Sequence, residues 1–191
     1  MSAPALALLR RMLGGGLNGV FAQAPGPETH EVEQLGIAAP RELWPPDDVV
    51  AAARALAVDS GARLLVTDDA EHGVAGAAFV YTDVWVSMGE SAEQWATRVP
   101  LLRPYQVTET LMRASGLPDT KFLHCLPAVH DTTTVLGRKL HDEYGLDGAE
   151  VTDEVFESAR AIVFDQAENR LHTIKAVLVA ALSDTRERVT G

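Results

Sequence analysis

The chain has 191 residues, enough for one globular domain and short for two, and its 47% hydrophobic and 23% charged residues are ordinary for such a domain. Its formal net charge of −11 argues against binding nucleic acid or an anionic membrane surface, since both need clustered Lys and Arg. A single cysteine fits a reducing cytoplasm, and no apolar run approaches the roughly 20 residues of a membrane span.

Strand-like and helix-like patterns alternate along the chain. We expect strands at 20–22, 37–39, 64–66, 77–81, 122–123 and 160–164. We expect helices at 5–13, 47–60, 104–114, 132–144 and 166–183, with shorter ones after residues 68, 91 and 152. The alternation predicts an α/β fold, a Rossmann-like three-layer domain with a mainly parallel sheet and helices on both faces.

Several helix details follow from local residues. Asp47 or Asp48 is expected to cap the helix that Gly61 closes, and Gly145 is expected to end the helix at 132–144. In the last helix, the apolar residues at helical spacing are expected to face the core: Leu171, Ile174, Val177, Leu178 and Ala181.

The stretch 121–130 carries three side chains of catalytic type: His124, Cys125 and His130. Phe122 precedes them in a short buried strand, which Pro127 stops because it lacks a backbone N–H. Ligands of open α/β sheets bind beyond the carboxyl ends of the strands, so this cluster is a candidate site. Because neighbours on a strand point to opposite faces, His124 is unsuited as a base for Cys125. Both histidines fit structural roles better.

Two other segments share this design, since 81–90 and 164–173 each begin with apolar residues and end with polar ones before a helix. Asp83 at a strand end can hold an ammonium group, and Ser87 and Met88 can form a loop that approaches a ligand. Alternatively, Asp83 is a helix cap before a surface loop. Arg170 in the first helical turn can bind an anion, or it is a solvated arginine.

Together these segments closely resemble the aspartate/ornithine carbamoyltransferase family, and ornithine carbamoyltransferase in particular. The resemblance rests on His124-Cys-Leu-Pro127, Asp83-Val-Trp-Val-Ser-Met-Gly89 and Glu168-Asn-Arg170, with 151–158 between them. It covers about 37–182 and corresponds to the C-terminal, ornithine-binding domain. It therefore implies an atypical N-terminal segment at 1–36, an ornithine-binding domain at 37–183 and a polar tail at 184–191.

The resemblance also implies roles for individual residues. Asp83, Ser87 and Met88 correspond to residues that contact L-ornithine in the family. Cys125 and Leu126 correspond to the pair whose backbone carbonyls orient the carbamoyl group, with no covalent intermediate on the thiol. Arg170 corresponds to a contact to carbamoyl phosphate. The reaction yields L-citrulline and phosphate, in arginine biosynthesis or degradation, and neither metal nor organic cofactor is implied.

Three family motifs do not occur in the chain: Ser-x-Arg-Thr-Arg, His-Pro-x-Gln and Gly-Asp-Gly-Arg-Asn-Asn. The first two belong to the carbamoyl-phosphate-binding domain, which we therefore expect to be absent. The chain alone should have little activity and should expose apolar surface. It is either an enzyme completed by a chain that supplies the missing domain, or a catalytically inactive remnant that binds amino acid or a partner. A homo-oligomer is also possible, and the motifs favour ornithine over aspartate or N-acetylornithine.

Overall fold

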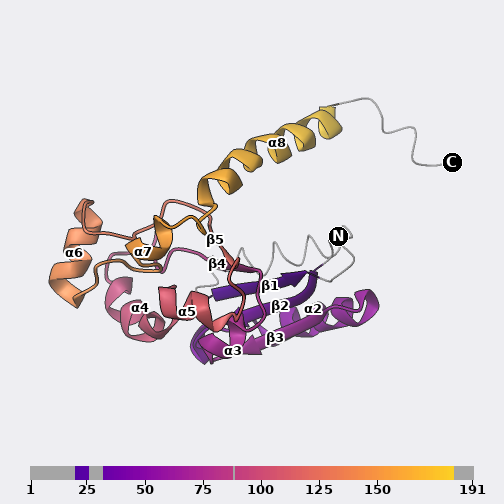
Figure 1. Cartoon of the computed structure of the whole chain (residues 1–191), viewed down its shortest axis with the longest axis horizontal. Helices are drawn as coiled ribbons and strands as arrows, with labels where there is room; N and C mark the ends of the chain where they lie inside the picture. Colours follow the sequence, from indigo (N-terminus) through magenta and orange to yellow (C-terminus); the bar gives the residue numbers. More distant parts are fainter. Residues whose placement is uncertain (1–19, 26–31, 88, 183–191) are drawn as a thin grey trace.

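The computed structural model describes residues 20–25, 32–87 and 89–182, and its centre is a five-stranded sheet (Figure 1). The strands are β1 (Val20–Pro25), β2 (Val32–Ala38), β3 (Arg63–Thr67), β4 (Phe79–Thr82) and β5 (Lys121–His124), in the order β3-β2-β1-β4-β5. Pairs β2–β3 and β4–β5 are parallel, whereas β1 is antiparallel to both of its neighbours. All strands except β1 therefore run the same way, as predicted. The helix expected at 5–13 lies outside the described residues.

Helices cover both faces of the sheet. Successive side chains along each strand point to opposite faces, so both faces carry apolar residues that a helix can bury. On one face, Ile37 packs with Val49 and Ala53 of α2 (Asp47–Ser60). The other face carries the largest core cluster, which α3 (Ala70–Val74) and α5 (Glu109–Ala114) cover. Its members include Ala38, Val74, Val80, Met112 and Phe122. The three-layer α/β prediction is confirmed.

A second core cluster surrounds Trp85, which follows β4 and is 1% exposed. It joins α4 (Gln94–Leu102) to α6 (Val135–Tyr144) through the buried residues Trp95, Val99, Leu102 and Leu140. Between the two helices the chain forms η2 (Arg103–Tyr105), and an earlier single turn, η1 (Arg41–Leu43), precedes α2. Trp85 thus anchors the segment after β4, which carries several candidate site residues.

The two glycines that were predicted to end helices do end them, whereas two other predictions about helices are wrong. Gly61 and Gly145 end α2 and α6 with φ of 74° and 64°, a conformation that glycine adopts without steric cost. The predicted cap at Asp47 or Asp48 is wrong: Pro46 is the N-cap, and both aspartates lie in the first turn, where they favour the helix dipole. The helix expected at 104–114 is interrupted, since Val107 instead forms a bridge with Val151.

The predicted strand at 160–164 is also wrong. Among the described residues, a single bridge between Phe122 and Ala161 extends the sheet beyond β5. Helix α8 (Val163–Leu182) begins directly after it, and the short α7 (Asp153–Phe156) precedes it. A five-residue apolar run is ambiguous between a strand and the start of a helix, and here its last two residues belong to the helix.

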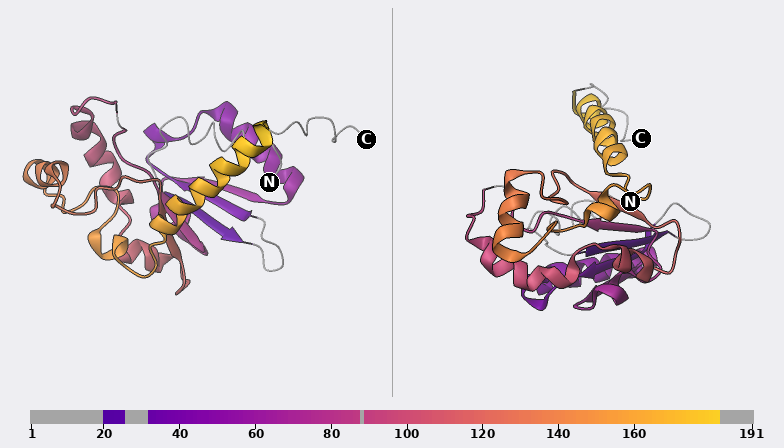
Figure 2. Two further views of the ribbon diagram at one scale, coloured as in Figure 1. Left: turned by 90° about the horizontal axis from the view of Figure 1, so that it is seen from above. Right: turned by 60° about the vertical axis from the view of Figure 1, so that its left-hand side comes forward.

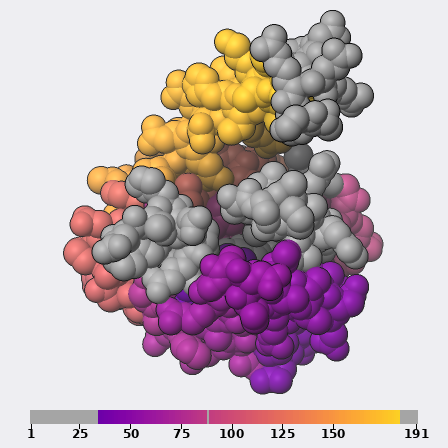
Figure 3. All heavy atoms as spheres, turned by 90° about the vertical axis from the view of Figure 1, so that its right-hand side faces the viewer, coloured from indigo at the N-terminus to yellow at the C-terminus, as the bar shows by residue number. Residues whose placement is uncertain are grey.

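Helix α8 leads away from the sheet, as two views agree (Figures 1 and 2). Its predicted core-facing side is exposed, which corrects the sequence expectation, and Val163 alone among its residues is buried. The exposed apolar stripe comprises Phe164, Leu171, Ile174, Val177, Leu178 and Leu182. Figure 3 shows α8, in yellow, standing out above the purple part of the chain that includes α2. Among the helices of the described residues, none is long and apolar enough to cross a membrane.

We predict that the α8 stripe binds a dye that fluoresces on exposed apolar surface. The double substitution Ile174→Glu and Leu178→Glu should remove most of the signal, because it places two charges within the stripe. The measurement is dye fluorescence of the purified variants. Val58→Glu is the matched control, since Val58 is 80% exposed on α2, outside the stripe. An equal loss in both variants would show that the dye does not report on α8.

Candidate functional site

Asp83 and Cys125 meet at the carboxyl ends of β4 and β5. These strands are parallel neighbours in which Thr82 pairs with His124, so the next residue of each strand lies beside the other. The Cys125 thiol donates a hydrogen bond to Asp83 Oδ1 over 2.8 Å, and the Val84 N–H donates to the same oxygen over 2.7 Å. Two residues that are far apart in the sequence are thereby joined in one polar site.

The Cys125 thiol is held in its protonated form. Burial raises the pKa of Cys125 to about 12, and the hydrogen bond to Asp83 and the charge of that carboxylate act in the same direction. A hydrogen bond with Tyr81 acts in the opposite direction but is outweighed. Because the thiolate is the nucleophilic form of cysteine, this thiol is unsuited to covalent catalysis at neutral pH. It can position a neighbouring group instead.

Tyr81 and Gln166 belong to this site, although the sequence analysis missed them. The Tyr81 hydroxyl hydrogen-bonds with the side chains of Cys125 and Gln166, and burial raises the pKa of Tyr81 above its usual range. Gln166 Oε1 also accepts the His124 N–H over 3.1 Å, which ties the first turn of α8 to the end of β5. Strand alternation could have found Tyr81, which shares a face with Asp83. Nothing in the sequence marks Gln166.

His124 points away from Cys125 and is fully buried, as the alternation predicts. Its Nδ1 accepts the Leu126 N–H over 2.8 Å, so the ring proton lies on Nε2. Nε2 lies 3.3 Å from Glu150 Oε1, within ion-pair distance but poorly aligned for a hydrogen bond. Glu150 Oε1 also accepts the Val129 N–H over 2.7 Å. His124 therefore braces the backbone that follows it.

This bracing matters because Leu126 has a φ of 54°, which is uncommon for any residue with a side chain. The Leu126–Pro127 peptide is cis. The hydrogen bond from Leu126 to His124 stabilises this turn, and with it the orientation of the Cys125 and Leu126 carbonyl groups. Glu150 is a third residue that was not found from the sequence, since a lone glutamate carries no pattern.

Ser87 lies in a turn that hydrogen bonds with Glu90 stabilise. The Ser87 N–H donates to a Glu90 carboxylate oxygen over 2.7 Å, and the Glu90 N–H donates back to the Ser87 carbonyl over 3.0 Å. Glu90 also forms a 3.4 Å ion pair with Arg98 of α4. The turn that carries Ser87 is thus tied to α4. Met88 lies outside the described residues.

The sequence predicted that Arg170 lies in the first turn of its helix. The structure contradicts this prediction. Because α8 starts at Val163, Arg170 is its eighth residue, about two turns from the amino end, and Asp165 lies within the first turn. The helix N-terminus therefore cannot assist an anion held by Arg170. Arg170 is exposed, and no described side chain forms an ion pair with it. Its contact with a phosphate stays a prediction.

A three-layer α/β domain with polar side chains at the carboxyl ends of neighbouring parallel strands is a ligand-binding domain of the Rossmann-like class. Residues 29–181 match the family model for the aspartate/ornithine carbamoyltransferase, Asp/Orn binding domain. The chain belongs to this family. The exact division at residues 36/37 and 183/184 stays a prediction.

Several solved structures with similar folds are ornithine carbamoyltransferases. The enzyme from Pyrococcus furiosus is 39% identical, with a TM-score of 0.61 over 74% of this chain and 39% of that one. The enzyme from Gloeobacter violaceus is 33% identical, with a TM-score of 0.60 over 76% and 41%. The anabolic enzyme from Campylobacter jejuni is 29% identical, with a TM-score of 0.61 over 76% and 42%. The chain thus spans about two-fifths of each.

We predict that Asp83→Asn speeds alkylation of Cys125. The carboxylate raises the thiol pKa, so a neutral amide should lower it, and each unit of decrease increases the thiolate fraction about tenfold below the pKa. Burial remains, so the pKa should stay above that of a free cysteine. The measurement is the iodoacetamide rate from pH 7 to pH 10. Asp68→Asn, which changes an aspartate that follows β3, should leave the rate unchanged. A slower or unchanged rate in Asp83→Asn would contradict the Asp83–Cys125 interaction.

Proposed function

We propose that this chain is the amino-acid-binding part of an ornithine carbamoyltransferase. In the proposed reaction, the δ-amine of L-ornithine attacks carbamoyl phosphate, and L-citrulline and phosphate are formed. The observation that carries the proposal is the contact between Asp83 and Cys125, which lie in the two segments that resemble the family most closely. The single cysteine fits a cytoplasmic location for this reaction.

The amino-acid side of the site is supported by the chemistry of Asp83. Its Oδ1 accepts two hydrogen bonds from the protein, which leaves Oδ2 to accept one from a substrate ammonium group. A charge-assisted hydrogen bond of this kind contributes about 1.5–3 kcal/mol. Ser87, which lies in the turn that Glu90 ties to α4, and Met88 complete the proposed contacts with L-ornithine.

The carbamoyl side is supported by the braced turn after β5. We assign the carbonyls of Cys125 and Leu126 to the NH₂ of the carbamoyl group, where two fixed acceptors would orient the carbonyl carbon for attack. The protonated thiol lies beside the proposed amine position and forms no covalent bond. The attacking amine must be neutral before it can react with the carbonyl carbon.

Binding of the phosphate group requires more positive charge than the residues assigned to it in this chain supply. Carbamoyl phosphate carries about two negative charges, and preorganised positive groups dominate this kind of catalysis. Arg170 is the one cation assigned to it. We therefore propose that a carbamoyl-phosphate-binding domain, whether in another chain or elsewhere in the polypeptide, completes the site. The exposed α8 stripe is the proposed contact surface, and a second copy of the chain is its alternative occupant.

Amino-acid binding without catalysis is the second candidate function. It is favoured by the surroundings of Cys125, whose described hydrogen-bond partners are Asp83, Tyr81 and the Val84 backbone, none of them a cation. In this case the pocket would bind L-ornithine but would not activate carbamoyl phosphate.

We predict that the purified chain binds L-ornithine and that Asp83→Ala weakens binding by about tenfold or more, because about 1.4 kcal/mol corresponds to a factor of ten. Calorimetric titration gives the dissociation constant. Asp68→Ala is the control, since Asp68 follows β3 as Asp83 follows β4. Equal binding by all three proteins would place the amino-acid site elsewhere, and no binding by the unsubstituted chain would refute the proposed function.

We further predict that the chain alone produces no citrulline above the background of Asp83→Ala when both substrates are supplied. One exposed arginine is too little positive charge for the leaving phosphate. A colorimetric citrulline assay measures the product. An ordinary enzymatic rate, on the order of 1 s⁻¹ or more, would show that no further domain is needed.

A further inference from the structure

Three side chains of metal-ligand type lie together outside the Asp83–Cys125 site. His130, Asp153 and Glu157 each offer one ligand atom, and these atoms lie within 4.8 Å of one another. His130 follows the turn at Pro127, Asp153 opens α7 and Glu157 is its C-cap. The four-residue spacing of the two carboxylates places them on one side of α7. The cluster therefore joins two separate segments of the chain.

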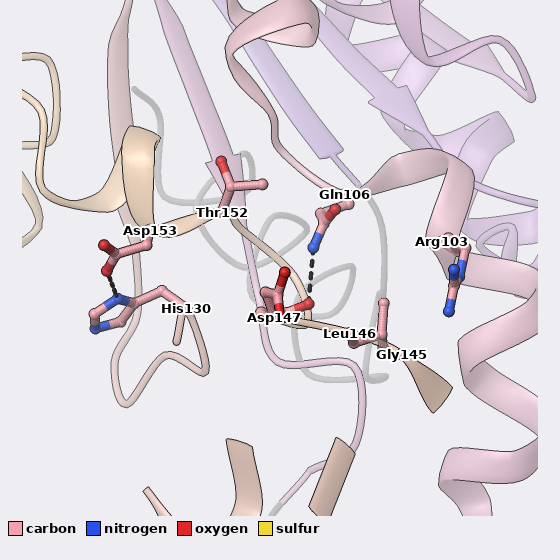
Figure 4. A pocket seen from close by; sticks show the side chains of 9 residues that line it. Arg103, Gln106, His130, Gly145, Leu146, Asp147, Thr152 and Asp153 are labelled. Atoms are coloured by element: carbon pink, nitrogen blue, oxygen red, sulfur yellow. Dashed lines mark hydrogen bonds and ion pairs between the residues drawn. The ribbon is translucent and has the colours of Figure 1, made fainter. Parts of the chain in front are cut away.

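The imidazole of His130 is fixed in position before any ligand binds. Its Nδ1 lies 2.7 Å from Asp153 Oδ1, as Figure 4 shows. Its ring stacks on Phe156 with centroids 3.9 Å apart and planes 8° from parallel. The backbone of His130 also lies against Gly148, where a Cβ would come within 2.6 Å of the His130 carbonyl oxygen. Such preorganisation lowers the cost of binding.

A cavity of about 250 Å³ adjoins the cluster and is lined by His130 and Asp153, together with Thr152 and residues near α6 (Figure 4). The Thr152 hydroxyl oxygen is buried and has no hydrogen-bond partner among the residues that the structure describes. A buried hydroxyl without a partner is uncommon and calls for a ligand or a bound water. This unsatisfied group is a second observation, independent of the three ligand side chains.

We propose that His130, Asp153 and Glu157 bind a divalent transition-metal ion of the zinc class. One imidazole nitrogen and two carboxylate oxygens are ligands that Zn²⁺ takes at about 2.0–2.2 Å, and a water molecule would take the fourth position. The carboxylate of Asp153 is 60% exposed, so it can move by the small distance that metal binding requires. The ion would clamp the segment after Pro127 to α7. The proposal does not rest on carbamoyl transfer.

A second histidine–aspartate pair in the same molecule serves as a control that distinguishes a metal site from an ordinary ion pair. His141 Nδ1 lies 2.9 Å from Asp147 Oδ1, a distance close to the 2.7 Å between His130 Nδ1 and Asp153 Oδ1. Among the described residues, no second carboxylate joins that pair in a three-ligand group. If the His–Asp contact alone bound metal, the two pairs would behave alike.

The test is titration of the chain with Zn²⁺ by calorimetry, and with Co²⁺ by visible absorption. Both use a Cys125→Ser background, so that the thiol cannot contribute a ligand. The variants are His130→Ala and Glu157→Gln, and the matched controls are His141→Ala and Glu154→Gln. Glu154 and Glu157 are both exposed on or next to α7, so the glutamine variants should fold alike.

We expect one Zn²⁺ per chain, with a dissociation constant raised at least tenfold by His130→Ala and Glu157→Gln and unchanged in both controls. Zn²⁺ should also raise the melting temperature of the background protein more than that of Glu157→Gln, because a ligand of the native state stabilises it. Absence of binding at millimolar Zn²⁺, or binding that Glu157→Gln leaves unchanged, would overturn the proposal. Equal weakening by His141→Ala would overturn it too.

Discussion

The hydrogen bond from the Cys125 thiol to Asp83 joins the two strand ends on which the candidate site depends. It exists because β4 and β5 are parallel neighbours in a register that places the residues after Thr82 and His124 side by side. Burial and the neighbouring carboxylate together keep the thiol protonated. The same contact orients Asp83, so one interaction adds to the effect of burial on the thiol pKa and also sets the direction of the carboxylate. The proposed binding of L-ornithine follows from that arrangement.

The direction of β1 distinguishes this sheet from a fully parallel one, because β1 is antiparallel to both of its neighbours. β1 occupies the central position beside β4 but runs the opposite way, so that Val20 lies opposite Thr82. A parallel strand there would bring its carboxyl end to the site, whereas β1 brings its amino end. The central strand thus supplies no carboxyl-end residue beside Asp83. A further domain that binds the phosphate stays our proposal, and the exposed α8 stripe is the surface proposed to contact it.

Much of the fold could be predicted because apolar strands and amphipathic helices alternate, and because glycines such as Gly145 stand where a helix must end. Asp83 and Cys125 were found because polar residues that follow a buried strand mark the carboxyl edge of a sheet. Gln166 and Glu150 were missed because their roles depend on contacts between distant segments, which a single sequence does not encode locally. The outward course of α8 was missed because an amphipathic pattern identifies an apolar face but not what covers it.

The S–H stretching band of Cys125 tests the central claim most directly, because the chain contains one thiol and the infrared band reports its hydrogen bond. The band should lie at the lower frequency of a hydrogen-bonded thiol, rise in Asp83→Asn, and change again when L-ornithine is added to the unsubstituted protein. A band at the frequency of a free thiol, unaffected by both Asp83→Asn and L-ornithine, would contradict the claim that Asp83 and Cys125 form an amino-acid site.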